Sequence, residues 1–241
     1  MGKHAIEICG LTKRYKDVTA VSDFSLDIEK GALTALLGVN GAGKTTLIGM
    51  LSGSIMPDSG DAVLLGHSIL NDAVAAKRLI SVSPQESAVA PRLTVWENLA
   101  MMAGIYGKDR QESAKTADEM IAAFDMEGIR DKQAGKLSGG WQRRLSIAMA
   151  LISEPQILFL DEPTLGLDVL ARRELWETIR GLRGKVTILM TTHYLEEAEA
   201  LSDRIAVMKS GRLVSAGTAR ELMEFAGKDN FEEAFVALST M

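Results

Sequence analysis

Short runs of apolar residues recur along the chain and alternate with stretches in which apolar residues have helical spacing. The runs are too short for helices, and most lack polar positions, as expected for strands buried on both faces of a sheet. Buried strands are predicted at Leu33–Leu37, Ile157–Leu160, Val186–Met190 and Ile205–Met208. Further strands are predicted at Ala5–Cys9 and at Phe24–Ile28, where polar and apolar residues alternate, and edge or hairpin strands at Asp61–Leu65 and Leu213–Ser215. Strands that alternate with helices are typical of an α/β protein with a parallel sheet.

The middle of the chain has helical patterns and no convincing strand from about Thr94 to Leu151. Thr94 and Glu97 form a candidate capping box before the apolar residues Leu99, Met102 and Tyr106. Lys115–Phe124 continues the helical spacing. We therefore expect one domain over residues 1–241, in which a helical part at about 91–154 divides an α/β core made of residues 1–90 and 155–241.

Composition, net charge and cysteine content limit the classes of protein and the cellular locations that fit this sequence. The chain has 241 residues with 46% hydrophobic residues, enough for a substantial core. Its formal net charge of −5 argues against a nucleic-acid partner. Cys9 is the only cysteine, which excludes an internal disulfide and favours a reducing, cytosolic setting. No apolar run is long enough to span a bilayer, so any link to a membrane is expected to come through a partner protein.

A phosphate-binding loop is predicted between an apolar strand and a helix. Residues 38–45, GVNGAGKT, match G-x-x-x-x-G-K-[ST] and follow Leu33–Leu37. In this context the glycines let backbone N–H groups surround phosphates, Lys44 reaches the β- and γ-phosphates, and the Thr45 hydroxyl binds Mg²⁺. An ordinary glycine-rich turn is the alternative. The predicted ATP-binding residues here are Gly38, Asn40, Gly41, Ala42, Gly43, Lys44, Thr45 and Thr46.

Two acidic residues end the apolar strand at Ile157–Leu160. Asp161 is expected to hold Mg²⁺, directly or through water, and Glu162 to act as the general base for the attacking water. The alternative is that both acids cap the segment that begins at Pro163, although the phosphate loop makes this the weaker interpretation. Together the two motifs predict a P-loop ATPase or GTPase, without deciding which.

Residues 136–144, KLSGGWQRR, closely resemble the signature segment of ABC ATPases. The resemblance implies that Ser138, Gly139 and Gly140 close over ATP held by another subunit, in a head-to-tail dimer of two copies or of two related ATPases. The usual signature has Gln where this chain has Trp141, and Gln142 follows. We expect function to survive this difference with altered affinity.

Four further segments resemble ABC ATPase landmarks, in the family's order. Tyr15 resembles the aromatic residue that stacks on adenine, with a half-buried core tyrosine as the alternative. Gln85, after Ile80–Ser83, resembles the glutamine that senses Mg²⁺ and couples to the membrane partner. Leu165–Asp168 resembles the D-loop, which lies at the dimer interface. His193 resembles the switch histidine, and the resemblance implies that His193, Glu162 and Lys44 are the catalytic residues. The implied fold is an α/β P-loop NTPase with a RecA-like core sheet, an antiparallel β subdomain and an inserted helical subdomain.

Two segments are similar to those of ABC-2-type exporters. They are Leu93–Leu99 with Gly104–Gly107, which in such exporters faces the membrane subunit, and the C-terminal stretch Phe231–Leu238. Trp96, Met101 and Met102 could form an adaptable groove for a partner's coupling helix, or simply helix core. The resemblance implies a motor subunit that hydrolyses ATP, lies on the inner face of the cell membrane, and binds an integral membrane permease.

Three rival functions are less consistent with the sequence. A soluble ABC ATPase acting on a non-membrane partner is the closest, although ribosomal versions carry two such domains. Chromosome-organising ATPases insert long coiled coils between the phosphate loop and the signature, and P-loop kinases or GTPases do not need the signature at all. The cargo is not readable from the sequence, and export is favoured over import without being fixed.

Overall fold

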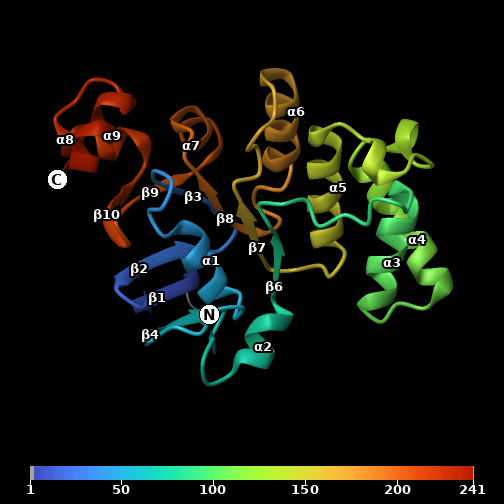
Figure 1. Cartoon of the computed structure of the whole chain (residues 1–241), viewed down its shortest axis with the longest axis horizontal. Coiled ribbons are helices and arrows are strands. Elements are labelled where there is room, and N and C mark those ends of the chain that lie inside the picture. The colour runs from blue at the N-terminus through green and yellow to red at the C-terminus, as the bar shows by residue number, and fades with distance from the viewer. Residues whose placement is uncertain (1–2, 241) are drawn as a thin grey trace.

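The computed structural model describes residues 3–240 and contains two β-sheets with helices packed around them (Figure 1). Met1, Gly2 and Met241, which belong to the predicted domain, lie outside the described residues. The larger sheet has six strands in the order β10-β9-β3-β8-β7-β6, all parallel except β10. Its strands are β3 (Leu33–Leu37), β6 (Ile80–Ser83), β7 (Ile157–Asp161), β8 (Thr187–Thr192), β9 (Arg204–Lys209) and β10 (Arg212–Gly217). The predicted parallel sheet is confirmed, as is the hairpin strand near Leu213.

The smaller sheet is antiparallel, with the order β2-β1-β4-β5. It consists of β1 (His4–Tyr15), β2 (Val18–Glu29), β4 (Ser59–Leu64) and β5 (His67–Ser68). Strands β1 and β2 extend well beyond the predicted Ala5–Cys9 and Phe24–Ile28. A register shift after Ile8, next to Gly10 with its φ of 62°, lets the ladder continue into polar residues. The apolar pattern marks only the buried part of each strand.

Apolar side chains on the two faces of the larger sheet belong to two different cores. On β7, Leu158 and Leu160 belong to the core shared with helices α3 to α9, whereas Ile157 and Phe159 belong to the core shared with α1, α2 and the antiparallel sheet. All four are completely buried. Because both faces of this sheet are covered, polar and apolar residues do not alternate along its central strands, which are continuous apolar runs in the sequence.

Helices surround the sheets and gather at two ends of the molecule (Figure 1). They are α1 (Lys44–Leu51), α2 (Ala73–Arg78), α3 (Val95–Ile105), α4 (Arg110–Ala123), α5 (Gly139–Leu151), α6 (Val169–Arg180), α7 (Leu195–Leu201), α8 (Ala219–Ala226) and α9 (Phe231–Thr240), with short 3-10 turns at Glu127–Ile129 and Ala134–Lys136. Helices α3, α4 and α5 lie together at one end, opposite α8 and α9. The C-terminal helix predicted at Phe231–Leu238 is confirmed as α9.

Helix α3 begins with the predicted capping box. The Thr94 hydroxyl accepts from the Glu97 N–H at 3.1 Å, and the Glu97 carboxylate accepts from the Thr94 N–H at 2.7 Å. Between Thr94 and Leu151 the structure has helices and one isolated bridge, Thr94–Gln133, but no strand. Tyr106, which the helical pattern grouped with Leu99, caps the end of the helix and is 48% exposed. The buried face of α3 is therefore formed by Leu99 and by the residues about one helical turn before and after it.

Across residues 3–240, no helix combines the length and the apolar character needed to cross a membrane.

Candidate functional site

The phosphate loop joins β3 to α1 and is held close to its neighbours. The N–H of Gly38 donates to the Thr192 carbonyl at 3.2 Å, and the Gly211 N–H donates to the Ala42 carbonyl at 2.8 Å. Gly43, at the N-cap of α1, has a φ of 106°, and a Cβ there would lie 2.2 Å from the Ala20 carbonyl oxygen. Only glycine fits this position, so the backbone N–H groups at the start of α1 can turn toward a bound anion.

A cavity of about 570 Å³ lies over this loop. Residues 40–46 line it together with Gln85 and Glu162, so the structure brings most of the predicted site residues to one place. The rest of the lining includes residues 18–20 at the start of β2 and Ser210, for which the sequence offered no chemical signal. Because the glycine loop, a helix N-terminus and a lysine converge here, the cavity suits a polyphosphate.

Lys44 and Glu162 form a buried ion pair on the floor of this cavity. The Nζ of Lys44 lies 3.1 Å from Oε1 of Glu162, and the two side chains are 5% and 8% exposed. Lys44 also donates to the carbonyls of Gly38 and Val39, at 2.7 and 3.2 Å. A buried ammonium needs such partners, and each of them is an oxygen that a phosphate oxygen could replace.

Glu162 has an unusual backbone. Its φ is 47°, in the left-handed region that non-glycine residues seldom adopt. Its N–H donates to the Thr191 hydroxyl at 2.9 Å and also to the Thr191 carbonyl at 3.2 Å, which holds the strained conformation in place. Strain of this kind costs about 1–3 kcal/mol and is typical of functional positions. It directs the Glu162 carboxylate toward the cavity instead of along the strand.

Asp161 lies directly beside the phosphate loop. Its Oδ1 accepts from the Thr45 hydroxyl at 3.3 Å and from the Thr191 hydroxyl at 2.5 Å. A carboxylate and a hydroxyl oxygen that face each other in this way are hard oxygen donors of the kind that suits Mg²⁺. Thr191 thus bonds both to Asp161 and to the backbone of Glu162, a role that sequence reasoning missed although two threonines precede His193.

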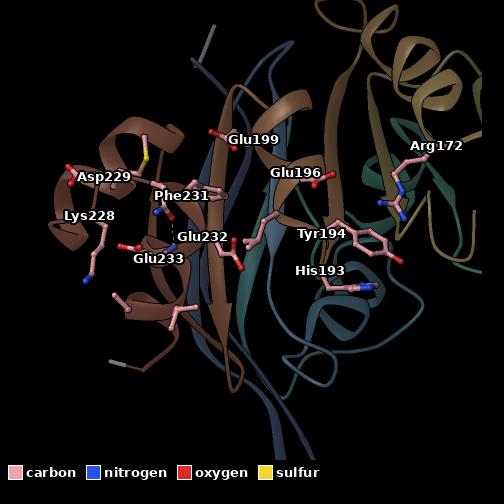
Figure 2. Close-up of a pocket in the computed structure, with 15 residues that line it drawn as sticks. Arg172, His193, Tyr194, Glu196, Glu199, Lys228, Asp229, Phe231, Glu232 and Glu233 are labelled. Atoms are coloured by element: carbon pink, nitrogen blue, oxygen red, sulfur yellow. Dashed lines mark hydrogen bonds between the residues drawn. The ribbon is translucent and has the colours of Figure 1, made fainter. Parts of the chain in front are cut away.

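His193 reaches the same carboxylate from the end of β8. Its Nδ1 lies 2.5 Å from Oε2 of Glu162, so Glu162 contacts Lys44 through one oxygen and His193 through the other. His193 does not line the phosphate-loop cavity but a larger one of about 1190 Å³, between α7 and α9 (Figure 2). A carboxylate between a lysine and an imidazole, next to an anion-binding loop, is an arrangement that can activate water beside a phosphate.

Ser138, Gly139 and Gly140 lie away from the phosphate-loop cavity. Ser138 is the N-cap of α5, makes no side-chain capping bond, and is exposed like Gly139. A Cβ on Gly140 would lie 3.0 Å from the Cβ of Ala171, so glycine lets the start of α5 approach α6 closely. The start of α5 is a helix N-terminus, which favours negative charge, and its residues Ser138–Gly140 do not line the phosphate-loop cavity.

Comparison with known proteins identifies the family. Residues 21–165 match the ABC transporter family. The chain belongs to the ABC transporter family. A daunorubicin resistance ATP-binding protein of Streptomyces coeruleorubidus is 40% identical over 233 residues, which cover 96% of this chain and 74% of that protein. A Nod factor export ATP-binding protein I of Burkholderia thailandensis is 42% identical over 221 residues, covering 91% and 72%.

A solved structure agrees with these relatives. The dimer of an ATP-binding cassette in a post-hydrolysis state, bound to ADP and Pi, matches with a TM-score of 0.78 at 25% identity, over 88% of this chain and 98% of that one. The chain is therefore an ABC transporter ATPase, which binds nucleotide and hydrolyses ATP. The predicted family, activity and α/β P-loop fold are confirmed.

Tyr15 is placed beside the nucleotide cavity of this ABC ATPase but not among its lining residues. It ends β1, is 44% exposed, and pairs across the hairpin with Val18, which does line the cavity. The Lys13 ammonium lies 5.5 Å from the centre of its ring. A half-exposed ring at this edge can stack on a flat ligand.

Trp141 occupies the signature position in which the family usually has Gln. Its ring packs on the helical core and lies 4.6 Å below the Arg144 guanidinium. Gln142 does not replace the missing Gln, because its side-chain amide donates to the carbonyls of Ala134 and Leu137, both at 3.2 Å. The half-buried indole is therefore held by the helical core and by Arg144, close to Ser138.

Arg143 connects the signature helix to the segment that carries Gln85. Its guanidinium is buried and donates to the carbonyls of Pro84 and Gln85. Burial lowers the pKa of Arg143, while the negative charge of Asp161 raises it. No sequence pattern singles out this arginine, because its partners are backbone atoms far away in the chain. The contact fixes the Gln85 backbone relative to α5.

We expect Arg143→Lys to loosen the Gln85 segment, because one ammonium cannot reproduce a fork that bonds two consecutive carbonyls. Amide hydrogen exchange in residues 84–90 should rise, and the KM for ATP should increase several-fold because Gln85 lines the cavity. Arg173→Lys, at an exposed position on α6, is the matched control. Unchanged exchange in residues 84–90 would show that Arg143 does not hold this segment.

Proposed function

We propose that this chain is the motor subunit of an ABC exporter and works as a head-to-tail pair on an integral membrane permease. The observation that carries this proposal is the position of Glu162, buried between Lys44 and His193 beside the phosphate loop, while the signature serine lies exposed elsewhere. One chain thus carries the phosphate loop and the proposed catalytic groups in one cavity, but its own signature residues lie outside that cavity and do not enclose the same nucleotide.

Binding of ATP is assigned to the phosphate loop. Backbone N–H groups of Asn40, Gly41 and Gly43, together with the start of α1 at Thr46, surround the phosphates. Gly38 and Ala42 shape the loop, because their N–H groups donate to backbone carbonyls. Lys44 leaves its carbonyl partners and Glu162 for the β- and γ-phosphates. Tyr15 stacks on the adenine at the edge of the cavity. The closeness of Lys44 to Gly38, Val39 and Glu162 supports this exchange of partners.

Thr45, Asp161 and Gln85 are assigned to Mg²⁺, which supplies charge neutralisation on the β- and γ-phosphates when it is bound. The short distance between the Thr45 hydroxyl and the Asp161 carboxylate supports this assignment. Gln85 lines the same cavity and adds an amide oxygen. Magnesium usually keeps several water and phosphate ligands, so two or three protein oxygens are enough.

Hydrolysis is assigned to Glu162 and His193. When Lys44 turns to the phosphates, the Glu162 carboxylate is released to take a proton from the attacking water. His193 already lies within hydrogen-bond distance of this carboxylate and orients it, and it can hold the water and the γ-phosphate in line. The strained backbone at Glu162 supports this role, because it fixes the base before substrate arrives.

The second surface is assigned to Ser138, Gly139 and Gly140 of another subunit, whether a copy of this chain or a related ATPase. Each nucleotide would then bridge the phosphate loop of one subunit and the signature of the other, and binding energy would close the pair. The helical part at about 91–154 acts as the subdomain that carries this signature. Trp141 contributes a flat apolar contact, on the ribose side, where other members have Gln.

The membrane partner is assigned to the exposed end of the helical part. Met101, Ile105 and Tyr106 of the α3 region are 39%, 68% and 48% exposed, which leaves an apolar surface for a coupling helix. Trp96, by contrast, donates to Asp118 at 2.9 Å and lies under Arg130, so it belongs to the helix packing. Export is supported by the name of the Nod factor export relative. A place on the inner face of the cell membrane follows from the proposed permease partner.

A soluble ABC ATPase that acts on a non-membrane partner is the alternative. Both kinds of protein would use the same nucleotide chemistry. The partner that binds the exposed α3 surface therefore distinguishes the two functions.

We expect Glu162→Gln to bind ATP and to hydrolyse it at least about a hundredfold more slowly, because the amide cannot accept the proton from water. The variant should accumulate with ATP as a closed dimer in size-exclusion chromatography, since the bridging nucleotide persists. Glu177→Gln, on the exposed face of α6, is the matched control. Near-normal turnover in Glu162→Gln would overturn the catalytic assignment.

Affinity purification of this chain from its native membranes in mild detergent should bring down a protein with several membrane-spanning helices. Replacing both Met101 and Ile105 with Ser should weaken this association and leave nucleotide binding intact, because the α3 end lies outside the nucleotide cavity. Recovery of ribosomal or other soluble proteins alone would contradict the exporter proposal and favour the alternative.

A further inference from the structure

Glu197, on α7, is a buried acid without a part in the proposed chemistry. Its side chain is completely buried. The other buried charged residues between 3 and 240 are Lys44, Arg143, Asp161 and Glu162, each of which has a role in the site or holds one of its loops. A carboxyl group is costly to bury unless its oxygens are well partnered. Its presence here therefore needs a physical reason.

The carboxyl group of Glu197 lies where three segments meet. From α6, the indole Nε1 of Trp176 donates to Oε1 at 3.1 Å. Thr164 and Thr192 lie beside the same carboxyl. Thr164 follows Glu162 by two residues, and Thr192 directly precedes His193. Glu197 thus contacts the two short segments that carry the proposed base and its histidine.

The polar atoms around Glu197 are incompletely bonded. Among the described residues, the buried side-chain atoms that lack a hydrogen-bond partner are Oε2 of Glu197, Oγ1 of Thr164 and Nε of Arg172. One is an acceptor and the other two are donors, and all belong to the surroundings of Glu197. The Arg172 guanidinium instead lies 4.2 Å from the centre of the Tyr194 ring (Figure 2). Because buried polar groups are normally paired, this cluster has bonds left to form.

We propose that Glu197 is a positioning residue for ATP hydrolysis, whose buried carboxyl group ties the turn after Glu162 and the strand end before His193 to helix α6. The inference rests on the proposed roles of Glu162 and His193. Asp168, at the end of the D-loop, is the N-cap of helix α6. A movement of the D-loop against a second subunit would therefore shift α6 and, through Trp176, the Glu197 carboxyl group. Thr164 and Arg172 are the donors available to its free oxygen.

The position of Glu197, more than its charge, favours a structural role over proton transfer. Burial raises the pKa of Glu197, while the polar side chains of Thr192, Thr164 and Trp176 and the charge of Arg172 lower it. Glu197 also lies outside the lining of the phosphate-loop cavity. Its effect on turnover must therefore pass through the placement of His193 and Glu162.

The test is a double-mutant cycle in the purified ATPase, with kcat and KM for ATP and nucleotide binding measured for each variant. Glu197→Ala should lower kcat about tenfold or more and change KM by less than about twofold, because a small misplacement of the catalytic groups slows the reaction strongly. Glu197→Gln should recover most of the rate, since its amide oxygen still accepts from Trp176. In a His193→Ala background, Glu197→Ala should cause a clearly smaller further loss, because only the placement of Glu162 is then left to disturb.

Glu199→Ala is the matched control, because Glu199 is exposed on the same helix and faces the larger cavity (Figure 2). If Glu197→Ala does not fold, Trp176→Phe removes the indole donor and should lower kcat more with His193 present than in its absence. Equal losses in both backgrounds, a raised KM at unchanged kcat, or a Trp176→Phe variant with full turnover would overturn the inference. Normal turnover in His193→Ala alone would overturn the proposed role of His193, and the inference with it.

Discussion

The buried contact of Glu162 with Lys44 and His193 is the interaction on which the site depends. It joins three segments that are far apart in the sequence: the phosphate loop, the end of β7 and the end of β8. An isolated carboxylate at this depth would be very costly, but a lysine on one oxygen and an imidazole on the other make it tolerable. The same contact keeps the base next to the place where the γ-phosphate arrives, and it can be exchanged when the lysine turns to the nucleotide.

The parallel sheet makes this contact possible. Strands β3, β7 and β8 are neighbours, and their carboxyl ends meet at one edge, so the loops that follow them share the same space. Thr191 then joins the loops, because its hydroxyl bonds to Asp161 and to the strained backbone of Glu162. The apolar strands supply the rigid frame, and the polar residues at their ends supply the chemistry.

Much of this arrangement follows from sequence patterns. Buried parallel strands are apolar throughout, so Leu33–Leu37 was placed without error, and the glycine loop and the acids at 161 and 162 come directly after such strands. The full extent of β1 and β2 was missed because a bulge shifts the ladder into polar residues. The roles of Arg143, Thr191 and Glu197 were missed for another reason. Their partners are backbone atoms or side chains from distant segments, and a linear pattern carries no record of such contacts.

The central claim is that a complete nucleotide site needs two subunits, with Lys44 from one and Ser138 from the other. It is tested most directly by mixing two inactive variants, Lys44→Met and Ser138→Arg, and measuring ATP hydrolysis. In mixed dimers one site has both intact halves, so the mixture should recover up to about a quarter of the wild-type rate, since half of the dimers are mixed and each has one intact site. A mixture as inactive as its components, or full activity of Ser138→Arg by itself, would contradict the account.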